Sequence, residues 1–201
     1  NIRLFYTTAD FSGENAFYFL KHSIIDQTNP AEPVEQPVPE MSVENQAFNS
    51  KVMTDHEGLL HCAWYDSEGG IRNISTAVFD GTEWGPTTKL VTNGQGTTLQ
   101  ESMPIVLAEA GSGETHAFWA ASMIGNGQYS SLDNSTWTPK QNINDPHFRN
   151  TCGITDSEDF LHMAGTELTL DGGELFYHVF KNGIWEHSLI ETGTPTSNPD
   201  F

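Results

Sequence analysis

Three histidines in similar short stretches are the first candidates for chemistry in this chain of 201 residues. His61, His116 and His162 lie in "GLLHCAW", "GETHAFW" and "DFLHMAG". Three imidazoles at equivalent positions could bind zinc if they faced a common axis. No metalloprotease motif and no cysteine pair of zinc spacing accompanies them. We therefore expect packed or hydrogen-bonded structural histidines, and we expect neither a metal site nor a cofactor.

Acidic residues are the second source of chemistry. The chain has 27 Asp and Glu against 8 Lys and Arg, so some carboxylates must lie close together, as glycoside hydrolysis requires. The "DSEGG" stretch at 66–70 lacks the alternating ligands of a calcium loop. No nucleophile elbow, phosphate loop or dinucleotide motif occurs in a suitable context. These observations favour a protein that is not an enzyme, with a carboxylate-based hydrolase as the alternative.

Aromatic residues beside Asp and Asn suggest binding of a neutral polar ligand such as a sugar. Aromatic rings stack on the C–H faces of a sugar, and nearby polar groups bond its hydroxyls. The candidate contacts are Trp64, Tyr65, Asp66, Arg72, Trp84, Trp119, Asn126, Trp137 and Trp185. Trp64 and Trp119 precede variable loops, so we rank them above the tryptophans that follow turns, and core packing remains the alternative for every ring. Repeated sites would make binding multivalent.

The net charge of -19 restricts the partners of the chain. Without a basic stripe, both a phosphate backbone and an anionic membrane surface are disfavoured. No apolar run approaches the roughly 20 residues of a membrane helix. We therefore expect glycans or glycoproteins as partners, with no nucleic acid and no membrane insertion, and a homo-oligomer is left open. The acidity and two glycosylation sequons favour secretion.

Two cysteines, Cys62 and Cys152, lie in different repeats. We expect both thiols to be buried and unpaired, since two cysteines do not make a disulfide framework, and a disulfide is the alternative if the chain is secreted. Their lack of pairing slightly favours a reducing compartment over secretion. The sequons begin at Asn73 and Asn134, and such triplets often arise by chance. The compartment is therefore left open.

The elements that position these residues recur along the chain. Three hairpins with a tryptophan after the turn are "STAVFDGTEW" (75–84), "YSSLDNSTW" (129–137) and "YHVFKNGIW" (177–185). Asp80-Gly81 and Asn182-Gly183 suit a hairpin turn that needs positive φ, and Asp133-Asn134 is a weaker version. The tryptophan that follows can bury its ring between adjacent sheets, so the repetition has a structural explanation.

Each repeat predicts four short strands in roughly 50 residues, the pattern of a β-propeller blade. An apolar strand comes first: "NSKVMTD" (49–55), "SMPIVLAE" (102–109) and "NTCGITD" (150–156). The histidine strand, the hairpin strand and a last short strand such as "TTKLV" (87–91) or "HSLIE" (187–191) follow. No segment keeps a helical period over three turns.

The N-terminal residues predict a degenerate fourth copy. Stretches 2–8 and 15–23 occupy the second and third strand positions, and the prolines of 28–40 predict an edge strand or a loop. Residues 197–201 resemble the start of a first strand and could pair beside 2–8 to close a ring. The sequence thus predicts a single all-β domain over 1–201, a β-propeller of four four-stranded blades or part of a larger ring. Its repeats are approximately 1–47, 48–101, 102–149 and 150–201.

The repeat resembles that of the sialidase-like propellers, also called BNR or Asp-box-like, over residues 48–187. It is similar to the propeller lectins of the Photorhabdus type and of fungi. The resemblance implies a propeller fold and carbohydrate binding. For a sialidase it also implies an arginine triad, and the chain has only Arg3, Arg72 and Arg149, of which only Arg72 lies in a well-preserved repeat. We therefore expect a lectin, with two alternatives: an interaction or storage propeller without sugar sites, or a glycoside hydrolase.

Overall fold

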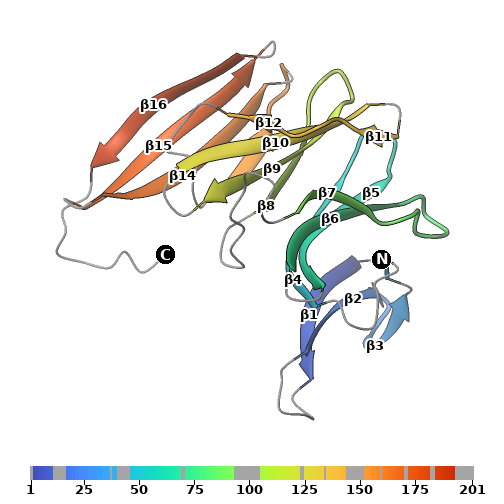
Figure 1. Cartoon of the computed structure of the whole chain (residues 1–201). Helices are drawn as coiled ribbons and strands as arrows, with labels where there is room; N and C mark the ends of the chain where they lie inside the picture. Colours follow the sequence, from blue (N-terminus) through green and yellow to red (C-terminus); the bar gives the residue numbers. More distant parts are fainter. Residues whose placement is uncertain are drawn as a thin grey trace. The chain divides into compact units, whose positions relative to one another are not determined.

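The computed structural model describes residues 2–10, 17–36, 38–39, 46–68, 71–92, 105–122, 125–133, 135–143, 152–158, 160–169, 172–181 and 184–192. The described residues form sixteen β-strands and contain no helix (Figure 1). The chain divides into two compact units, residues 1–97 and 98–201. Within the described residues, no element is a helix that could span a membrane.

The first unit contains two antiparallel sheets, each built from strands that are consecutive in the chain. The first sheet consists of β1 (Ile2–Asp10), β2 (Phe17–Asp26) and β3 (Asn29–Gln36). The second sheet consists of β4 (Gln46–Thr54), β5 (Leu60–Glu68), β6 (Ile71–Phe79) and β7 (Thr88–Thr92). The proline-bearing β3 lies at the edge of the first sheet, as its sequence predicts, because an edge strand tolerates missing N–H donors.

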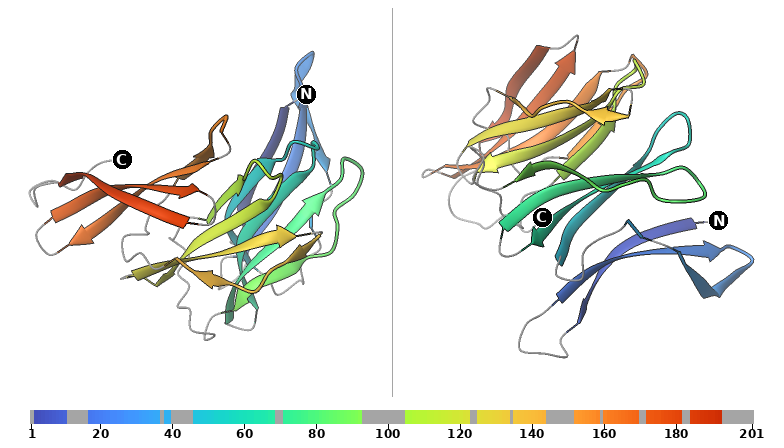
Figure 2. Two further views of the ribbon diagram at one scale, coloured as in Figure 1. Left: turned by 90° about the horizontal axis from the view of Figure 1, so that it is seen from above. Right: turned by 45° about the vertical axis from the view of Figure 1, so that its right-hand side comes forward.

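The second unit also contains two antiparallel sheets, drawn in yellow and in orange to red (Figure 2). The third sheet consists of β8 (Ile105–Glu109), β9 (Thr115–Ser122), β10 (Gly125–Asp133), and the short β11 (Thr136–Trp137) and β12 (Gln141–Asn142). The fourth sheet consists of β13 (Cys152–Thr155), β14 (Leu161–Thr169), β15 (Gly172–Lys181) and β16 (Ile184–Thr192). The four sheets follow the predicted repeats closely. The expected ring closure involves residues 197–201, which lie outside the described residues.

Each unit has a hydrophobic core between its two sheets. In the first unit the core contains Leu20, Cys62, Trp64 and Ala77, with Val38, Val52 and Trp84 packed against it. In the second unit it contains Val106, Ala108, Phe118, Ile143, Leu161 and Met163, with Tyr129, Phe180 and Trp185 packed against it. Both lists combine residues of neighbouring sheets, so burial of these side chains holds the sheets of each unit together.

The tryptophans after the hairpin turns pack between sheets, which confirms that prediction for Trp84 and Trp185. The ring of Trp84 meets Phe5 of the first sheet edge-on at 5.9 Å. The ring of Trp185 meets Phe118 of the third sheet edge-on at 5.4 Å. The turn before Trp84 has Gly81 at a φ of 101°, the conformation for which glycine was predicted.

Both cysteines are free, as predicted, but only Cys62 is buried. Burial raises the pKa of the Cys62 thiol to about 12, so this thiol is protonated at neutral pH. The expectation that Cys152 is buried is wrong: it lies exposed on β13, a four-residue strand whose residues alternate between exposed and half-buried.

Candidate functional site

The candidate contacts on the central strands lie in the core. Trp64 and Trp119 are both 0% exposed, and Tyr65 and Asp66 are buried as well. The indole N–H of Trp119 donates to Gln128 Oε1 at 3.1 Å. These residues lie on β5 and β9. In chain order each is the second strand of its sheet, and each pairs with another strand on both sides. The structure therefore corrects the ranking: these rings offer no exposed face on which a sugar could stack.

Asp66 has a structural set of partners. Its carboxylate accepts a hydrogen bond from Asn73 Nδ2 at 2.6 Å and another from Ser75 Oγ. Asn73, the first residue of a sequon, is itself buried, so its amide is inaccessible to glycosylation in the folded chain. The second sequon begins at Asn134, outside the described residues.

The other candidate contacts do not form one site either. Arg72 is half-buried at the start of β6, and Trp137 is half-buried on β11 opposite Leu132. Trp84 and Trp185 are half-buried in the packing described above. Asn126 lies on β10, and its side chain is outside the described residues. The nine candidates are thus distributed over three sheets.

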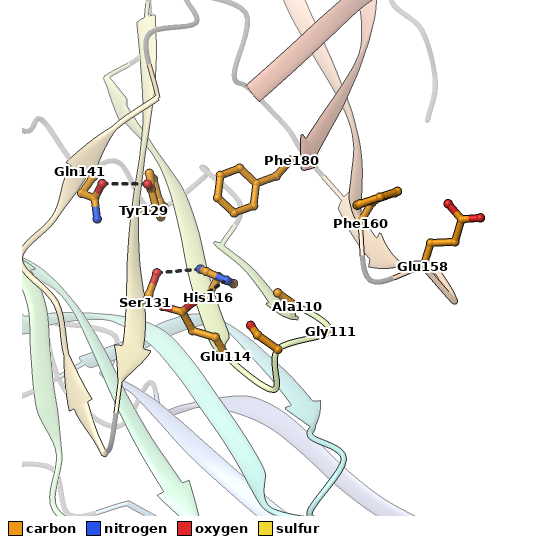
Figure 3. Close-up of a pocket in the computed structure, with 11 residues that line it drawn as sticks. Ala110, Gly111, Glu114, His116, Tyr129, Ser131, Gln141, Glu158, Phe160 and Phe180 are labelled. Atoms are coloured by element: carbon orange, nitrogen blue, oxygen red, sulfur yellow. Dashed lines mark hydrogen bonds and ion pairs between the residues drawn. The ribbon is translucent and has the colours of Figure 1, made fainter. Parts of the chain in front are cut away.

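A pocket of about 590 Å³ lies in the second unit, between the third and fourth sheets (Figure 3). Its aromatic wall consists of Tyr129, Phe160 and Phe180. Its side chains that can hydrogen-bond are Ser112, Glu114, His116, Ser131, Gln141 and Glu158, and Ala110 and Gly111 complete the lining. None of the nine candidate contacts lines it. The ring of Trp185 packs against Phe180 of the aromatic wall, with the two ring centroids 4.9 Å apart.

The pocket lies at the opposite end of β9 from the loop favoured by the sequence. Its lining includes the turn at 110–114, which leads into β9, whereas the variable loop follows β9 at residue 122. The turn at 156–160, which leads into β14, contributes Glu158 and Phe160. Equivalent turns of two neighbouring sheets therefore build the pocket.

In the second sheet, the histidine after this turn is bonded to an aspartate. His61 Nε2 lies 2.7 Å from Asp55 Oδ2. Asp55 Oδ1 accepts from the backbone N–H groups of Glu57 at 3.0 Å and Leu59 at 2.8 Å. Burial alone would raise the pKa of Asp55, but hydrogen bonds from His61 and the two N–H groups outweigh it and lower that pKa.

The fourth sheet repeats this arrangement. His162 Nε2 lies 2.5 Å from Asp156 Oδ2, and the N–H groups of Glu158 and Phe160 donate to Asp156 Oδ1 at 2.8 and 3.0 Å. His162 Nδ1 is bonded to the hydroxyl of Tyr177. The hydrogen bond from His162 and that from the Phe160 N–H lower the pKa of Asp156. His61 and His162 are therefore hydrogen-bonded structural histidines, as predicted.

The third sheet has the same turn without the aspartate. Ala110 stands six residues before His116, where Asp55 and Asp156 stand before their histidines. The backbone is unchanged: the Gly113 N–H donates to Ala110 O at 2.8 Å, as the Gly58 N–H donates to Asp55 O at 3.1 Å. Gly113 and Gly58 have φ of 79° and 84°. Alignment of the three copies would have revealed this difference from the sequence.

His116 consequently has one nitrogen, Nε2, to which no described residue is hydrogen-bonded. The residue is 3% exposed, and its Nδ1 lies 2.8 Å from Ser131 Oγ. Within the described part of the chain, its buried Nε2 has no hydrogen bond, and Glu114 Oε2 is 3.8 Å away. Burial lowers the pKa of His116 against the opposing effect of Glu114, so the ring is neutral at pH 7. Figure 3 shows this ring between Ser131 and the turn at Ala110 and Gly111.

The described residues contain no group of three or more His, Cys, Asp or Glu side chains placed to hold a metal ion. The chemistry visible in the pocket is stacking on aromatic rings and hydrogen bonding. Tyr129 OH donates to Gln141 Oε1 at 2.8 Å, which orients both side chains at the pocket wall.

Comparisons with solved structures identify the fold. The chain is similar to the Hadza microbial sialidase Hz136, with a TM-score of 0.60, 15% identity, and coverage of 90% of this chain and 38% of that one. It is similar to an α-L-arabinanase from Penicillium chrysogenum complexed with arabinobiose, with a TM-score of 0.53, 11% identity, and coverage of 87% and 55%. It is also similar to the K499G mutant of the NanB sialidase from Streptococcus pneumoniae, with a TM-score of 0.59, 12% identity, and coverage of 94% of this chain and 35% of that one.

The chain has a β-propeller fold. The all-β fold class predicted from the repeats is thereby confirmed, and four antiparallel sheets are consistent with four blades. The chain spans between about a third and just over half of the length of these propellers. No protein-family profile matches it, and no curated protein matches its sequence. The single domain over 1–201 stays a prediction.

Proposed function

We propose that this propeller binds carbohydrate as a lectin, through the pocket of its second unit. The observation that carries the proposal is the lining: three aromatic residues and six residues with hydrogen-bonding side chains line one pocket of about 590 Å³. This volume falls within the roughly 300–1,000 Å³ of typical ligand sites. Rings and polar groups in one cavity are what a sugar requires, because it has both C–H faces and hydroxyls.

The similar propellers support a carbohydrate ligand. They are two sialidases and an arabinanase complexed with arabinobiose. At 11–15% identity, this similarity supports only a general relation to glycans. The resemblance to Photorhabdus-type lectins and the multivalent binding also belong to the proposal, and only the sequence repeats support them.

A glycoside hydrolase is the second candidate, because Glu114 and Glu158 line the same pocket. Two carboxylates on either side of a glycosidic bond are the usual catalytic set of such enzymes. An arginine triad is not supported. Arg3 lies over the ring of Phe79 at 5.0 Å in the first unit, and neither Arg3 nor Arg72 lines the pocket. Arg149 is outside the described residues.

A glycan array followed by titration calorimetry tests the lectin proposal. Gln141→Ala removes an exposed side chain of the pocket and its bond with Tyr129, so it should weaken sugar binding several-fold. Gln27→Ala changes an exposed glutamine of the first unit and should bind as the wild type does. Far-UV circular dichroism checks that both variants fold.

Three outcomes separate the candidates. Binding that Gln141→Ala weakens and Gln27→Ala leaves unchanged supports the lectin. Release of chromophore from aryl glycosides, abolished by Glu114→Gln or Glu158→Gln, would support the hydrolase instead. No binding to any glycan at high protein concentration would contradict the lectin and leave the interaction or storage propeller as the remaining class.

A further inference from the structure

Two turns of this protein show how its backbone binds a carboxylate. In each, one Asp carboxylate receives three hydrogen bonds: from a histidine Nε2 and from the backbone N–H groups two and four residues after the Asp. We call this set of three donors the carboxylate cradle. In the second sheet it holds Asp55, and in the fourth sheet it holds Asp156.

The third sheet has a carboxylate cradle and no Asp of its own to fill it. The equivalent donors are the N–H groups of Ser112 and Glu114 and Nε2 of His116. The turn keeps the two backbone hydrogen bonds found in the second sheet, since the Ala110 N–H also donates to Glu114 O at 2.9 Å, as the Asp55 N–H donates to Leu59 O at 3.0 Å. Ala110 has only a methyl group where the other two turns have a carboxylate, and Ala110 and all three donor residues line the pocket.

The hydrogen-bonding of His116 suits a donor that faces the pocket. When the Ser131 hydroxyl donates to Nδ1, the single proton of the neutral ring lies on Nε2. His162 has the same pattern, with a tyrosine hydroxyl on Nδ1 and a carboxylate on Nε2. His116 therefore has the first of these two partners, and its Nε2 is buried at the pocket wall.

We propose that the carboxylate cradle of the third sheet binds the carboxylate of an acidic sugar, of which a hexuronic acid is the simplest. The proposal rests on the carbohydrate-binding function proposed above and names its ligand class. A carboxylate uses all three donors, because one oxygen accepts from His116 and the other from both N–H groups. A hydroxyl or a carbonyl has one oxygen and leaves part of the set unsatisfied.

Nearby negative charges weaken this binding and do not abolish it. Glu114 and Glu158 line the pocket, and both repel an anion. However, Asp55 is ionised in the same cradle beside Glu57, and Asp156 is ionised beside Glu158. The hydrogen bonds from histidine and from the backbone N–H groups lower the pKa values of both aspartates, so this set of donors favours a charged carboxylate.

Calorimetry on the full chain at pH 7 compares three probes: methyl glucuronide, the neutral methyl glucoside, and acetate. The expected result is that the glucuronide binds at least about ten-fold more tightly than the glucoside. NMR of the His116 imidazole nitrogens should show the Nε2-protonated form with glucuronide or acetate bound.

Ala110→Asp supplies the missing carboxylate and should reduce glucuronide binding by about ten-fold or more. Its matched control is Ser112→Glu, which adds the same charge at the position that Glu57 and Glu158 occupy in the other turns. This control should weaken binding less than Ala110→Asp does, because Glu57 and Glu158 do not occupy the cradle in their own turns. Glu114→Gln should strengthen binding of the glucuronide more than that of the glucoside, because it removes a charge that repels only the anion.

The outcomes distinguish this proposal from the function on which it rests. Equal binding of glucuronide and glucoside, or unchanged glucuronide binding by Ala110→Asp, would overturn the cradle and leave carbohydrate binding intact. If neither sugar binds but acetate shifts the His116 signals in the wild type and not in Ala110→Asp, the cradle stands and the lectin function fails. If none of the probes binds, both proposals fail.

Discussion

The turn at 55–61 in the second sheet and the turn at 110–116 in the third have the same backbone hydrogen bonds, but only the first contains an aspartate that binds to them. Both have a glycine at positive φ, the same pair of backbone hydrogen bonds, and a buried histidine at the end. The first has an aspartate that joins the histidine to the turn, so every donor is used within the chain. The second has Ala110, and its histidine faces a pocket.

A single side-chain difference, Ala110 in place of an aspartate, therefore separates a structural motif from a candidate site. The backbone that holds a carboxylate is already built, because the turn forms its glycine-dependent hydrogen bonds with or without the aspartate. A second change accompanies the first. Ser131 stands directly opposite His116, where the second and fourth sheets have Val78 and Val179 opposite their histidines.

The largest expected effect is that of Asp55→Ala on stability. The Asp55 side chain is 8% exposed, and its removal leaves His61 Nε2 and two N–H groups without their acceptor. We expect a loss of about 2–3 kcal/mol in the free energy of unfolding, measured by urea titration. The control Glu57→Ala, in the same turn and exposed, should change it by less than about 0.5 kcal/mol. Equal effects of the two variants would mean that the cradle contributes nothing to stability.

Asp156→Ala should have a smaller effect than Asp55→Ala. The Asp156 and His162 side chains are 35% and 25% exposed, so water replaces part of the lost hydrogen bonding. The same urea titration, with Glu158→Ala as control, measures the difference. A loss as large as that of Asp55→Ala would contradict the role given to burial.

Ala110→Asp should stabilise the chain while it blocks the site. The new carboxylate gives His116 Nε2 and two N–H groups an acceptor, with an expected gain of about 1 kcal/mol in the free energy of unfolding. Thermal unfolding of Ala110→Asp and of the control Ser112→Glu measures it. A destabilised Ala110→Asp would show that the turns of the second and third sheets are not equivalent.

The smallest expected effect is a difference in pH dependence between pH 7 and 5. Burial lowers the pKa of His116 in the folded chain, so below its ordinary value of about 6.5 the unfolded chain binds more protons. Proton uptake by His116 in the unfolded chain therefore lowers the free energy of unfolding as the pH falls below that value and has no effect well above it. In Ala110→Asp the new carboxylate raises the pKa of His116, and the loss should shrink or reverse. Parallel urea titrations at pH 7, 6 and 5 test this, and identical slopes would contradict it.

The sequence predicted the elements well because the signals that form them are local. Asp80-Gly81 marks a hairpin by its backbone preference, and Gly81 has the positive φ of 101° that this preference predicts. The packing of Trp84 and Trp185 between sheets also followed from their place after a turn. The burial of two candidate contacts was not predicted, for the opposite reason. Whether Trp64 and Trp119 are exposed depends on what covers β5 and β9, and their own neighbours in the chain do not show it.

By itself, the sequence determined a chain of repeated β-hairpins, an all-β propeller and a net charge of -19. It also contained the replacement of aspartate by Ala110, which is visible when the three histidine stretches are aligned. Only the tertiary structure decided that this replacement lies at a pocket. The reason is that Phe160 and Phe180, which complete the pocket wall opposite His116, come from a neighbouring sheet, and the packing of the core that the two sheets share sets the distance between them.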